Sequence, residues 1–377
     1  MIDGPIQLSL YIGPGVPIPV SREILDALVK VEIREAAGPG VRSGFQMTFE
    51  ISKDSILNTL LLTIGSVGPI VRCTFVLTIS GTPFVAMDGV ITEHQVTPVS
   101  DTGLASLTVT GEDLTAVMNQ IDFTGIPYPA MPREARVALI VAKYALFGMI
   151  PLVIPSVFFE VPLPTETIPT HQGTDLTYIE AMANEVGYVF YIDSGPALGL
   201  NTAYWGPEIK VGAPQPALNV NMDAHTNVET ISFKYDAQKA ELPIIFIQNQ
   251  ATKVPIPIPI PPVNPLAPPL GLVPPIPTKI KMMKNTAQMT PIQALALGLA
   301  EAAHSFDVVS ADGTLDVLRY GRLLRARQLV GLRGVGSTFN GLYFVQKVTS
   351  RFRRGEFKQD FTLTRNGLES TVSSVPN

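Results

Sequence analysis

Residues 44–52, GFQMTFEIS, alternate apolar and polar side chains, and this alternation decides the class of fold. Successive side chains of a strand point to opposite faces, so the apolar residues of this stretch share one face. These residues are Phe45, Met47, Phe49 and Ile51. The polar residues Gln46, Thr48 and Glu50 share the other face. A period of two predicts a strand that is buried on one side only.

Five further segments of this kind lie in the first 115 residues. They are β-branched or alternating, and Gly, Pro or Ser residues separate them, as is typical of short strands. They comprise residues 4–13, 27–36, 70–80, 84–98 and 104–114. Many short strands in so short a stretch favour a barrel or a sandwich. We therefore predict a β-barrel domain over residues 1–115, completed by strands near residues 220–250.

The middle of the chain, residues 116–219, has a mixed pattern that predicts a small inserted α+β module. Pro132 and Gly148 bracket one helix, since proline favours the first turn of a helix and glycine follows the last. Thr174 or Asp175 can cap a second helix, in which apolar residues recur at helical spacing. A strand, YVFYID, follows it directly. The fold class is therefore mainly β with an α+β insertion.

Residues 253–278, KVPIPIPIPPVNPLAPPLGLVPPIPT, contain eleven prolines among 26 residues. Proline has no amide hydrogen to donate, so this segment is predicted to be neither a helix nor an interior strand. Its other residues are mainly apolar, unlike those of a free linker. We interpret it as an extended loop that lies along another protein surface. The alternatives are a mobile linker between domains and a ligand for SH3-type domains.

Residues 279–377 are predicted to form a second β-barrel domain with a C-terminal hairpin. A helix begins at Pro291, with Thr290 as its cap. Three segments with the composition of strands follow the helix: LLRARQLVGLRG, LYFVQKVTSRF and KQDFTLTRNG. Gly355 is available for the turn of a hairpin between the last two.

The composition argues against several classes of function. Charged residues make up 16% of the chain, against about 25% in a typical soluble domain, so apolar surface is expected to be buried between subunits. The net charge of −5 argues against a nucleic-acid surface. The most apolar stretch, residues 137–159, contains Pro151 and Pro155, which would break a membrane-spanning helix. The first residues lack a basic segment, so we expect no signal peptide and synthesis in the cytoplasm.

No pattern of catalytic residues emerges, and we expect no enzyme. The four histidines have no partner at a metal-binding spacing and no glycine-rich phosphate motif is present, so neither a metal nor another cofactor is expected. Glu112 and Asp113 would point to opposite faces of a strand, and Asp113 fits a helix cap better than an acid–base pair. Cys73 fits a small core residue. Tyr204 and Trp205 form the one obvious pair for stacking on a sugar, although packing against their own helix is the favoured interpretation.

Several long segments, taken in order, carry a resemblance to a known family. They are MDGVITEHQVTP (87–98), LTVTGEDL (107–114), IPYPAMPREARVALIVAKYALFGMIPLVIPS (126–156), TYIEAMANEVGYVFYID (177–193), NTAYWGPEI (201–209) and YGRLLRARQLVGLRGVGSTFNGLYFVQKVTSRFRRGEFKQDFTLTRNGLES (320–370). With these segments the chain resembles the phage late control D family, the baseplate hub proteins of contractile tails. Relatives in that family include the hub of T-even phages and the N-terminal part of VgrG in type VI secretion.

The resemblance implies a homotrimeric hub whose chains each carry two barrels similar to the tail tube protein, so that a threefold spike meets a sixfold tube. The implied partners are further copies of the chain, a separate spike protein, the inner tube or its initiator, and other baseplate proteins. The particle would be a phage tail or an extracellular or cell-associated injection device.

Contacts in this assembly are expected from the proline-rich loop and from the C-terminal hairpin, which would join the sheets of neighbouring subunits. The expected interface residues are Pro255, Pro257, Pro259, Pro261, Arg351, Arg353, Arg354, Phe357 and Phe361. Two alternatives remain open from the sequence. One is a tail-associated carbohydrate hydrolase, and the other is a β-protein at the tail tip that binds a receptor or glycan.

Overall fold

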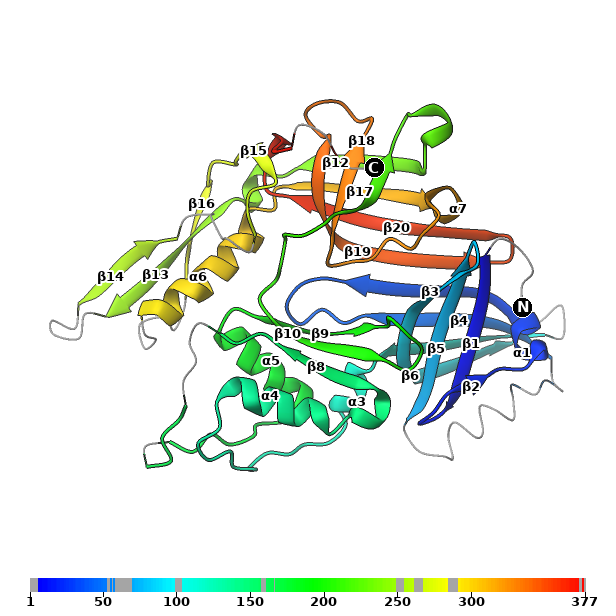
Figure 1. Cartoon of the computed structure of the whole chain (residues 1–377), viewed down its shortest axis with the longest axis horizontal. Helices are drawn as coiled ribbons and strands as arrows, with labels where there is room; N and C mark the ends of the chain where they lie inside the picture. The colour runs from blue at the N-terminus through cyan, green and yellow to red at the C-terminus, as the bar shows by residue number, and fades with distance from the viewer. Residues whose placement is uncertain are drawn as a thin grey trace.

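One sheet of 13 strands joins the N-terminal and C-terminal parts of the chain (Figure 1). The computed structural model describes residues 6–52, 70–98, 104–156, 161–248, 254–260, 267–283 and 291–372, apart from residue 166, together with Ser55, Leu57 and Val375. The main path of the sheet runs, in spatial order, through β12 (Val228–Tyr235), β17 (Val309–Asp316), β20 (Glu356–Arg365), β19 (Gly341–Arg353), β3 (Leu28–Ala36), β4 (Gly44–Ile51), β7 (Ala105–Asp113), β6 (Thr82–Pro98), β5 (Val71–Ile79), β1 (Ile6–Pro14) and β2 (Ile18–Pro19). A branch at β19 adds β18 (Leu329–Arg333) and β11 (Gln215–Asn219).

The seam between the two parts of the chain is the antiparallel pairing of β3 with the second half of β19. β19 and β20 form the predicted hairpin, and Gly355 takes a positive φ of 76° in its turn. We expected this hairpin to join sheets of neighbouring subunits. Instead, β3 and β17 of the same chain occupy its two edges, so its backbone hydrogen bonds are satisfied within the chain.

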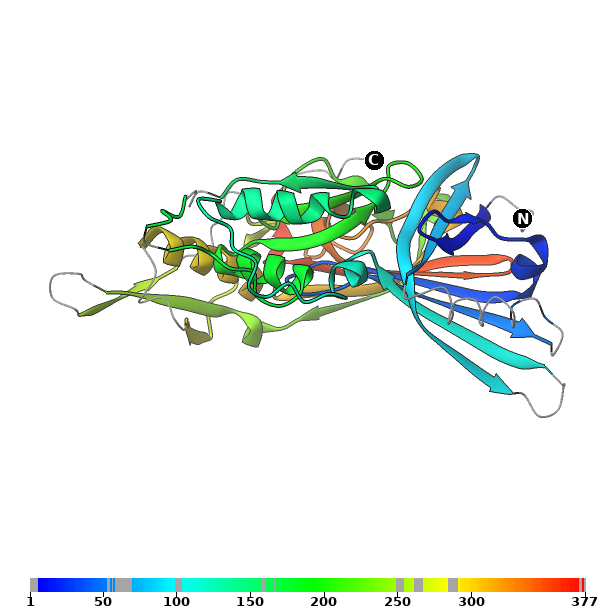
Figure 2. The same ribbon diagram turned by 90° about the horizontal axis from the view of Figure 1, so that it is seen from below.

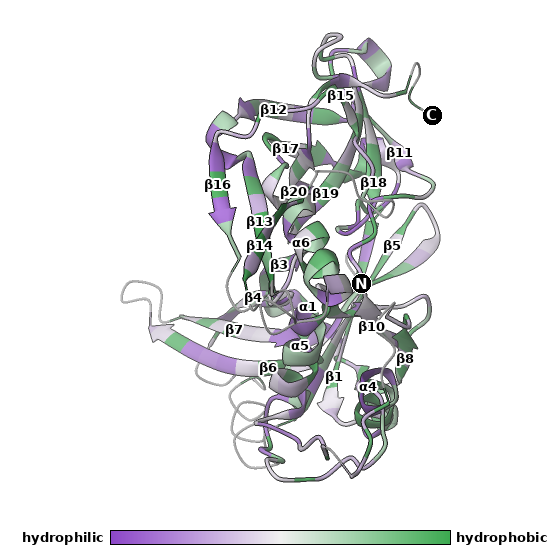
Figure 3. Ribbon diagram, turned by 90° about the vertical axis from the view of Figure 1, so that its left-hand side faces the viewer, coloured by the Kyte–Doolittle hydropathy of each residue, from purple (hydrophilic) through white to green (hydrophobic). Residues whose placement is uncertain are grey.

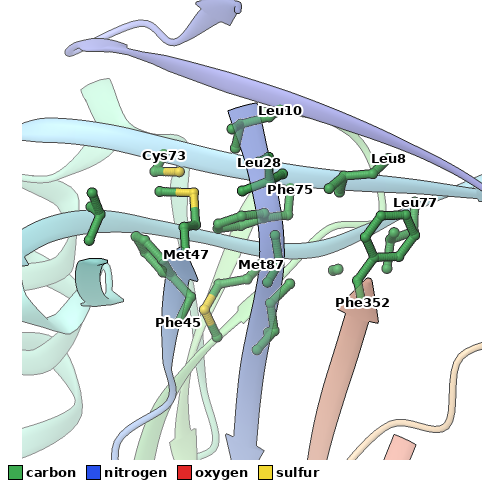
Figure 4. Packing of buried hydrophobic residues seen from close by; sticks show 14 of the residues in the cluster. Leu8, Leu10, Leu28, Phe45, Met47, Cys73, Phe75, Leu77, Met87 and Phe352 are labelled. Carbon is green, nitrogen blue, oxygen red and sulfur yellow. The ribbon is translucent and has the colours of Figure 1, made fainter. Parts of the chain in front are cut away.

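The N-terminal half of the sheet folds over a hydrophobic core. β1, β5 and the first part of β6 cover the inner face of β3, β4 and β7, and α1 (Arg22–Ala27) lies at the rim. Phe45, Met47 and Phe49 are buried in this core, as the alternation predicts. Figure 4 shows Phe45 and Met47 beside Cys73 and Phe75 from β5. Among the described residues the strand pairing closes no barrel; each half is an open, folded sheet.

The C-terminal half encloses a second core between β12, β17, β20 and β19 on one side and β18 and β11 on the other. α7 (Val317–Tyr320) borders it. This pairing corrects the expectation that strands near residues 220–250 complete the N-terminal domain. β11 pairs with β18 and β12 pairs with β17, so both belong to the C-terminal half. The mainly β class with an α+β insertion is confirmed.

The inserted module packs helices against a three-stranded sheet. Its strands are β8 (Met149–Val153), β9 (Val189–Ser194) and β10 (Asn201–Gly206), and its helices are α3 (Thr115–Met118), α4 (Arg133–Ala142) and α5 (Asp175–Glu185), with the short 3-10 helix η1 (Ala145–Phe147) between α4 and β8. A further 3-10 helix, η2 (Asp223–His225), lies between β11 and β12 in the C-terminal half. Both long helices were predicted. Pro132 precedes α4, and Thr174 caps α5 by accepting a hydrogen bond from the backbone N–H of Thr177 at 3.3 Å.

The proline-rich segment forms part of an arm at one end of the molecule, defined here as β13 (Glu241–Gln248), β14 (Pro255–Pro259), β16 (Lys279–Met282) and α6 (Pro291–Ser305) (Figure 1). β14 is an edge strand, a sheet position that tolerates proline. β15 (Gly271–Val273) pairs separately with β21 (Leu368–Ser370), and η3 (Ala237–Lys239) precedes the arm. α6 begins at Pro291 as predicted, whereas its expected cap, Thr290, lies outside the described residues. No helix in the described part of the chain is long and apolar enough to cross a membrane.

Candidate assembly surfaces

The largest candidate surface is the outer face of the central sheet, opposite the two cores. Along seven adjacent strands, the side chains on this face are polar. They are Thr230, Ser232 and Lys234 on β12, Ser310, Asp312 and Thr314 on β17, Lys358, Asp360 and Thr362 on β20, Lys347, Thr349 and Arg351 on β19, Lys30, Glu32 and Arg34 on β3, Gln46, Thr48 and Glu50 on β4, and Thr108, Thr110 and Glu112 on β7. We call this surface the polar sheet face. Figure 3 shows hydrophilic stretches continuing along β6 and β12 at its two sides.

Positive and negative side chains are interspersed on the polar sheet face and neutralise one another locally. Arg351 lies 2.5 Å from Asp360, and Lys30 lies 2.6 Å from Glu32. A hydrogen bond from Lys358 lowers the pKa of the carboxyl group of Glu356. Such exposed pairs add little stability. Together with the many Thr and Ser hydroxyls, they produce a wet surface without a strong field of either sign.

The sequence-predicted hairpin residues divide between this face and the cores. Arg351 lies on the polar sheet face, Arg353 is exposed, and Arg354 in the hairpin turn donates to the backbone carbonyl of Asp26. Phe357 packs edge-on against Phe352, with ring centroids 5.7 Å apart, and is buried in the N-terminal core. Phe361 is buried in the C-terminal core. The two phenylalanines therefore stabilise the chain itself rather than presenting a surface to a partner.

The predicted prolines lie on the outer edge of the arm. Pro255, Pro257 and Pro259 alternate with Ile256 and Ile258 along β14, and Pro261 lies outside the described residues. Ile258 faces Ile245 across the β13–β14 ladder. Because backbone groups alternate in direction along a strand, the isoleucines direct their N–H groups toward β13 and the prolines occupy the outward positions. The free edge of β14 therefore has no N–H donors at these three positions.

The seam between the halves is reinforced by a half-buried arginine that sequence reasoning missed. Arg325 lies 2.5 Å from Glu35 on β3 and also donates to the backbone carbonyl of Val85 on β6 at 2.6 Å. Burial disfavours the charged guanidinium, but the carboxylates of Glu35 and Asp193 outweigh this cost and raise the pKa of Arg325. Arg325 is one of several arginines in a locally basic stretch, so nothing in the sequence singles it out for this role.

A second missed cluster ties the α+β module to the N-terminal sheet. Asp88 on β6 is buried and accepts hydrogen bonds from Nε of Arg72 at 2.8 Å and from Nδ2 of Asn201 on β10 at 2.9 Å. Arg72 and Asn201 both also donate to the backbone carbonyl of Phe147. Because each charged group finds several partners, the buried pair is fully compensated. These hydrogen bonds hold the α+β module against the N-terminal sheet.

The residues considered for hydrolysis or glycan binding are engaged within the fold. Asp113 is buried, and burial raises the pKa of its carboxyl group. It accepts a hydrogen bond from the backbone N–H of Thr115 at 2.9 Å, just before α3, although Leu114 and not Asp113 occupies the N-cap position. Glu112 points to the opposite face beside Arg42. Trp205 is fully buried, as the interpretation of packing within the module predicts. Within the described residues no group of three His, Cys, Asp or Glu side chains could hold a metal ion.

This architecture is the fold of phage tail proteins. A tail protein from Neisseria meningitidis MC58 is similar over 96% of this chain and 97% of its own, with a TM-score of 0.61 and 13% identity. The 43 kDa tail protein of prophage MuSo2 from Shewanella oneidensis is similar over 96% of this chain and 98% of its own, with a TM-score of 0.62 and 14% identity.

The same fold occurs in type VI secretion. An E. coli component of that system, described as structurally similar to the T4 tail proteins gp27 and gp5, matches 93% of this chain and 77% of its own, with a TM-score of 0.53 and 13% identity. No protein-family model and no curated protein match the chain. The resemblance predicted from the sequence is therefore confirmed at the level of the fold.

Proposed function

We propose that three copies of this chain form the structural hub of a contractile phage tail or a related injection device. The central sheet carries the proposal. It contains two four-stranded sections, β12-β17-β20-β19 and β3-β4-β7-β6, joined side by side within one chain. Three copies offer six such sections, which is the number needed to adapt a threefold spike to a sixfold inner tube.

The polar sheet face is the surface that we assign to the lumen of this ring. A channel through which other molecules pass needs a wetted wall that binds none of them strongly. Paired charges such as Arg351 and Asp360, set among Thr349, Thr362 and other hydroxyls, meet that need. The role is mechanical: the seam between β3 and β19 holds the two sections in a fixed relation while force passes from tube to spike.

The partners follow from this placement. One end of the ring would bind the inner tube or its initiator, and the other end would bind a separate spike protein. Other baseplate proteins would bind the outer side of the ring. The chain would be made in the cytoplasm and function within the assembled tail or particle.

The mass of the purified chain in solution tests the proposal. Light scattering is expected to give three times the chain mass of 40.6 kDa, and electron microscopy is expected to show a threefold ring with a central hole. A stable monomer at micromolar concentration contradicts the proposal.

The assignment of the lumen has its own test. Cys73 is buried, so a cysteine introduced by Thr349→Cys is the accessible thiol. In the assembled ring, closed at one end by the spike, a small maleimide is expected to label it and a large polyethylene-glycol maleimide is not. Leu139→Cys, at an exposed position of α4, is the control that should accept both reagents. Equal labelling of both positions by the large reagent would place the polar sheet face on the outside.

A further inference from the structure

The arm sheet has one covered face and one open face. On the covered face, Ile245 and Ile258 pack against Ala302 and its neighbours on α6. Side chains in register across the strands share a face, so the opposite face carries an aliphatic and proline-rich set. Its members are Leu242, Ile244, Pro257, Pro259, Ile280 and Met282. Ile280 is 65% exposed and Met282 is 66% exposed. We call this surface the open arm face.

A partner cannot reach the arm by adding a strand at β14. Ile260 donates its backbone N–H to the carbonyl of Pro243 at 2.9 Å, which fixes the direction of the amide groups along this strand. Pro257 and Pro259 therefore face outward, and a new strand would find no N–H donors there. Contact along the β14 side of the arm must therefore be made through side chains, such as those of the open arm face.

The size of the open arm face limits what can occupy it. Three strands about 4.8 Å apart, with about five residues of about 3.3 Å each, give a face of roughly 200–250 Å². A specific interface that holds by itself buries about 800 Å² on each partner. The occupant must therefore be a molecule that other contacts already hold in place, such as a neighbouring subunit of the ring.

The chain carries a second aliphatic surface of similar character, on the α+β module. β8 is an edge strand, and Ile150 and Leu152 are 53% and 47% exposed on it. Leu200 lies beside them, directly before β10, and is 41% exposed. We call these three residues the β8 patch.

The two surfaces cannot cover each other within one chain. α6 packs against the arm sheet on one side and approaches the module on the other, where a Cβ on Gly187 would lie 2.6 Å from Ala300. The open arm face consequently points away from the module, and Figure 2 shows α6 between them. A contact between two different surfaces of neighbouring copies is head-to-tail, and such contacts form a ring when the rotation between copies closes.

We propose that the open arm face of one copy docks on the β8 patch of the next copy around the ring. This inference rests on the proposed function, because it takes the ring itself as the source of the remaining contact area. The arm then connects neighbouring copies. Because the β14 edge lacks N–H donors at its prolines, further strands cannot pair along it.

Disulfide trapping between singly substituted chains tests the proposal. Chains with Met282→Cys and chains with Leu152→Cys are assembled together and oxidised, with the buried Cys73 as the one native thiol. A covalent dimer is expected from the mixture and not from either variant alone. A dimer from Met282→Cys alone would mean that arms meet arms, which overturns the proposal. An intact trimer without any disulfide overturns it while leaving the proposed function in place, and a monomeric protein overturns both.

A charge on the open arm face gives an independent readout. Ile280→Asp is expected to raise the concentration at which the trimer dissociates by about tenfold or more, because docking would bury an unpaired carboxylate. Ile256→Asp is the matched control, since Ile256 is 47% exposed but lies on the opposite side of the arm sheet. Both variants should retain the circular dichroism spectrum of the parent chain. Equal dissociation of the two variants, or none in either, contradicts the proposal.

Discussion

Arg325 and Glu35 are separated by 290 positions in the sequence and by 2.5 Å in the fold. The pair lies at the seam where the N-terminal and C-terminal halves share one sheet. Arg325 also holds the carbonyl groups of Val85 and Ala86, so one guanidinium contacts two strands of the other half. These side-chain contacts add to the backbone pairing of β3 with β19 in holding the two halves together.

Replacing Glu35 is expected to destabilise the chain strongly. Glu35→Gln leaves the half-buried guanidinium of Arg325 without its carboxylate, and we expect a loss of about 1.5–3 kcal/mol in the free energy of unfolding. Urea denaturation measures it. Asp360→Asn, which removes an exposed partner of Arg351, is the control and should cost less than about 1 kcal/mol. Similar losses for both variants would mean that the seam pair has no special role.

Asp88 is expected to determine how firmly the α+β module is attached. Asp88→Ala leaves Arg72 and Asn201 without their shared acceptor, so we expect a loss of about 3–5 kcal/mol and faster amide exchange in β10. Hydrogen exchange with mass spectrometry locates the change. Adding Arg72→Met to an Asp88→Leu variant should recover part of the loss, because no unpaired charge is then buried. A uniform rise in exchange throughout the chain would contradict a local role.

The prolines of β14 are expected to protect the arm from aggregation. Pro257→Val restores an N–H donor on the free edge without changing the apolar character of the strand, so strands from other molecules can pair there. We expect the same secondary structure but visible self-association at concentrations where the parent chain remains at its defined mass. Pro274→Val, at an exposed position outside the strands, is the control. Unchanged solubility of Pro257→Val would remove the protective role.

Acid is expected to loosen the α+β module through His171. This side chain is fully buried, with Nδ1 3.0 Å from the hydroxyl of Tyr128 and Nε2 3.5 Å from Asp175. Burial lowers the pKa of the imidazole, although Asp175 acts in the opposite direction, and the charges of Lys143 and Asp122 also face it.

Because the folded-state pKa lies below the unfolded value of about 6.5, the unfolded chain binds the extra proton first. The contribution to stability is complete above about pH 6.5 and is lost as the pH falls toward the folded-state pKa. His171→Asn should therefore flatten the dependence of the unfolding free energy on pH between about pH 7 and pH 5. His225→Asn, at an exposed position, is the control and should keep the parent slope. If His171→Asn keeps the pH dependence of the parent chain, the loss of stability in acid arises from groups other than His171.

Local patterns in the sequence predicted the elements of this fold well. The alternation around Phe45 gave a strand and its buried face, and Thr174 marked the start of α5, because both signals arise from residues close together in the chain. The resemblance to phage tail proteins could also be recognised from the sequence, because it rests on long segments that occur in a fixed order. Pairing between distant strands has no such signal. The junction of β3 with β19, and the place of β12 beside β17, depend on which edges remain open after folding.

The interface residues were harder to predict for a related reason. Phe357 and Phe361 alternate with Lys358 and Asp360, which is the same period of two as in residues 44–52, and this pattern already indicates a buried face. Their place in a hairpin that was expected to join neighbouring subunits suggested an interface instead. The open arm face was missed because the proline-rich segment was interpreted as an extended loop, whereas part of it is an edge strand with proline at every second position.

The seam between β3 and β19 also has a consequence for synthesis. Val31 pairs with Phe352, which leaves the ribosome roughly 320 residues later. At bacterial elongation speeds of about 5–20 residues per second, the nascent β3 waits roughly 15–60 s for its neighbour. Throughout that interval the β3 edge has no partner from its own chain, so strands of other molecules can compete for it until the last hairpin is made.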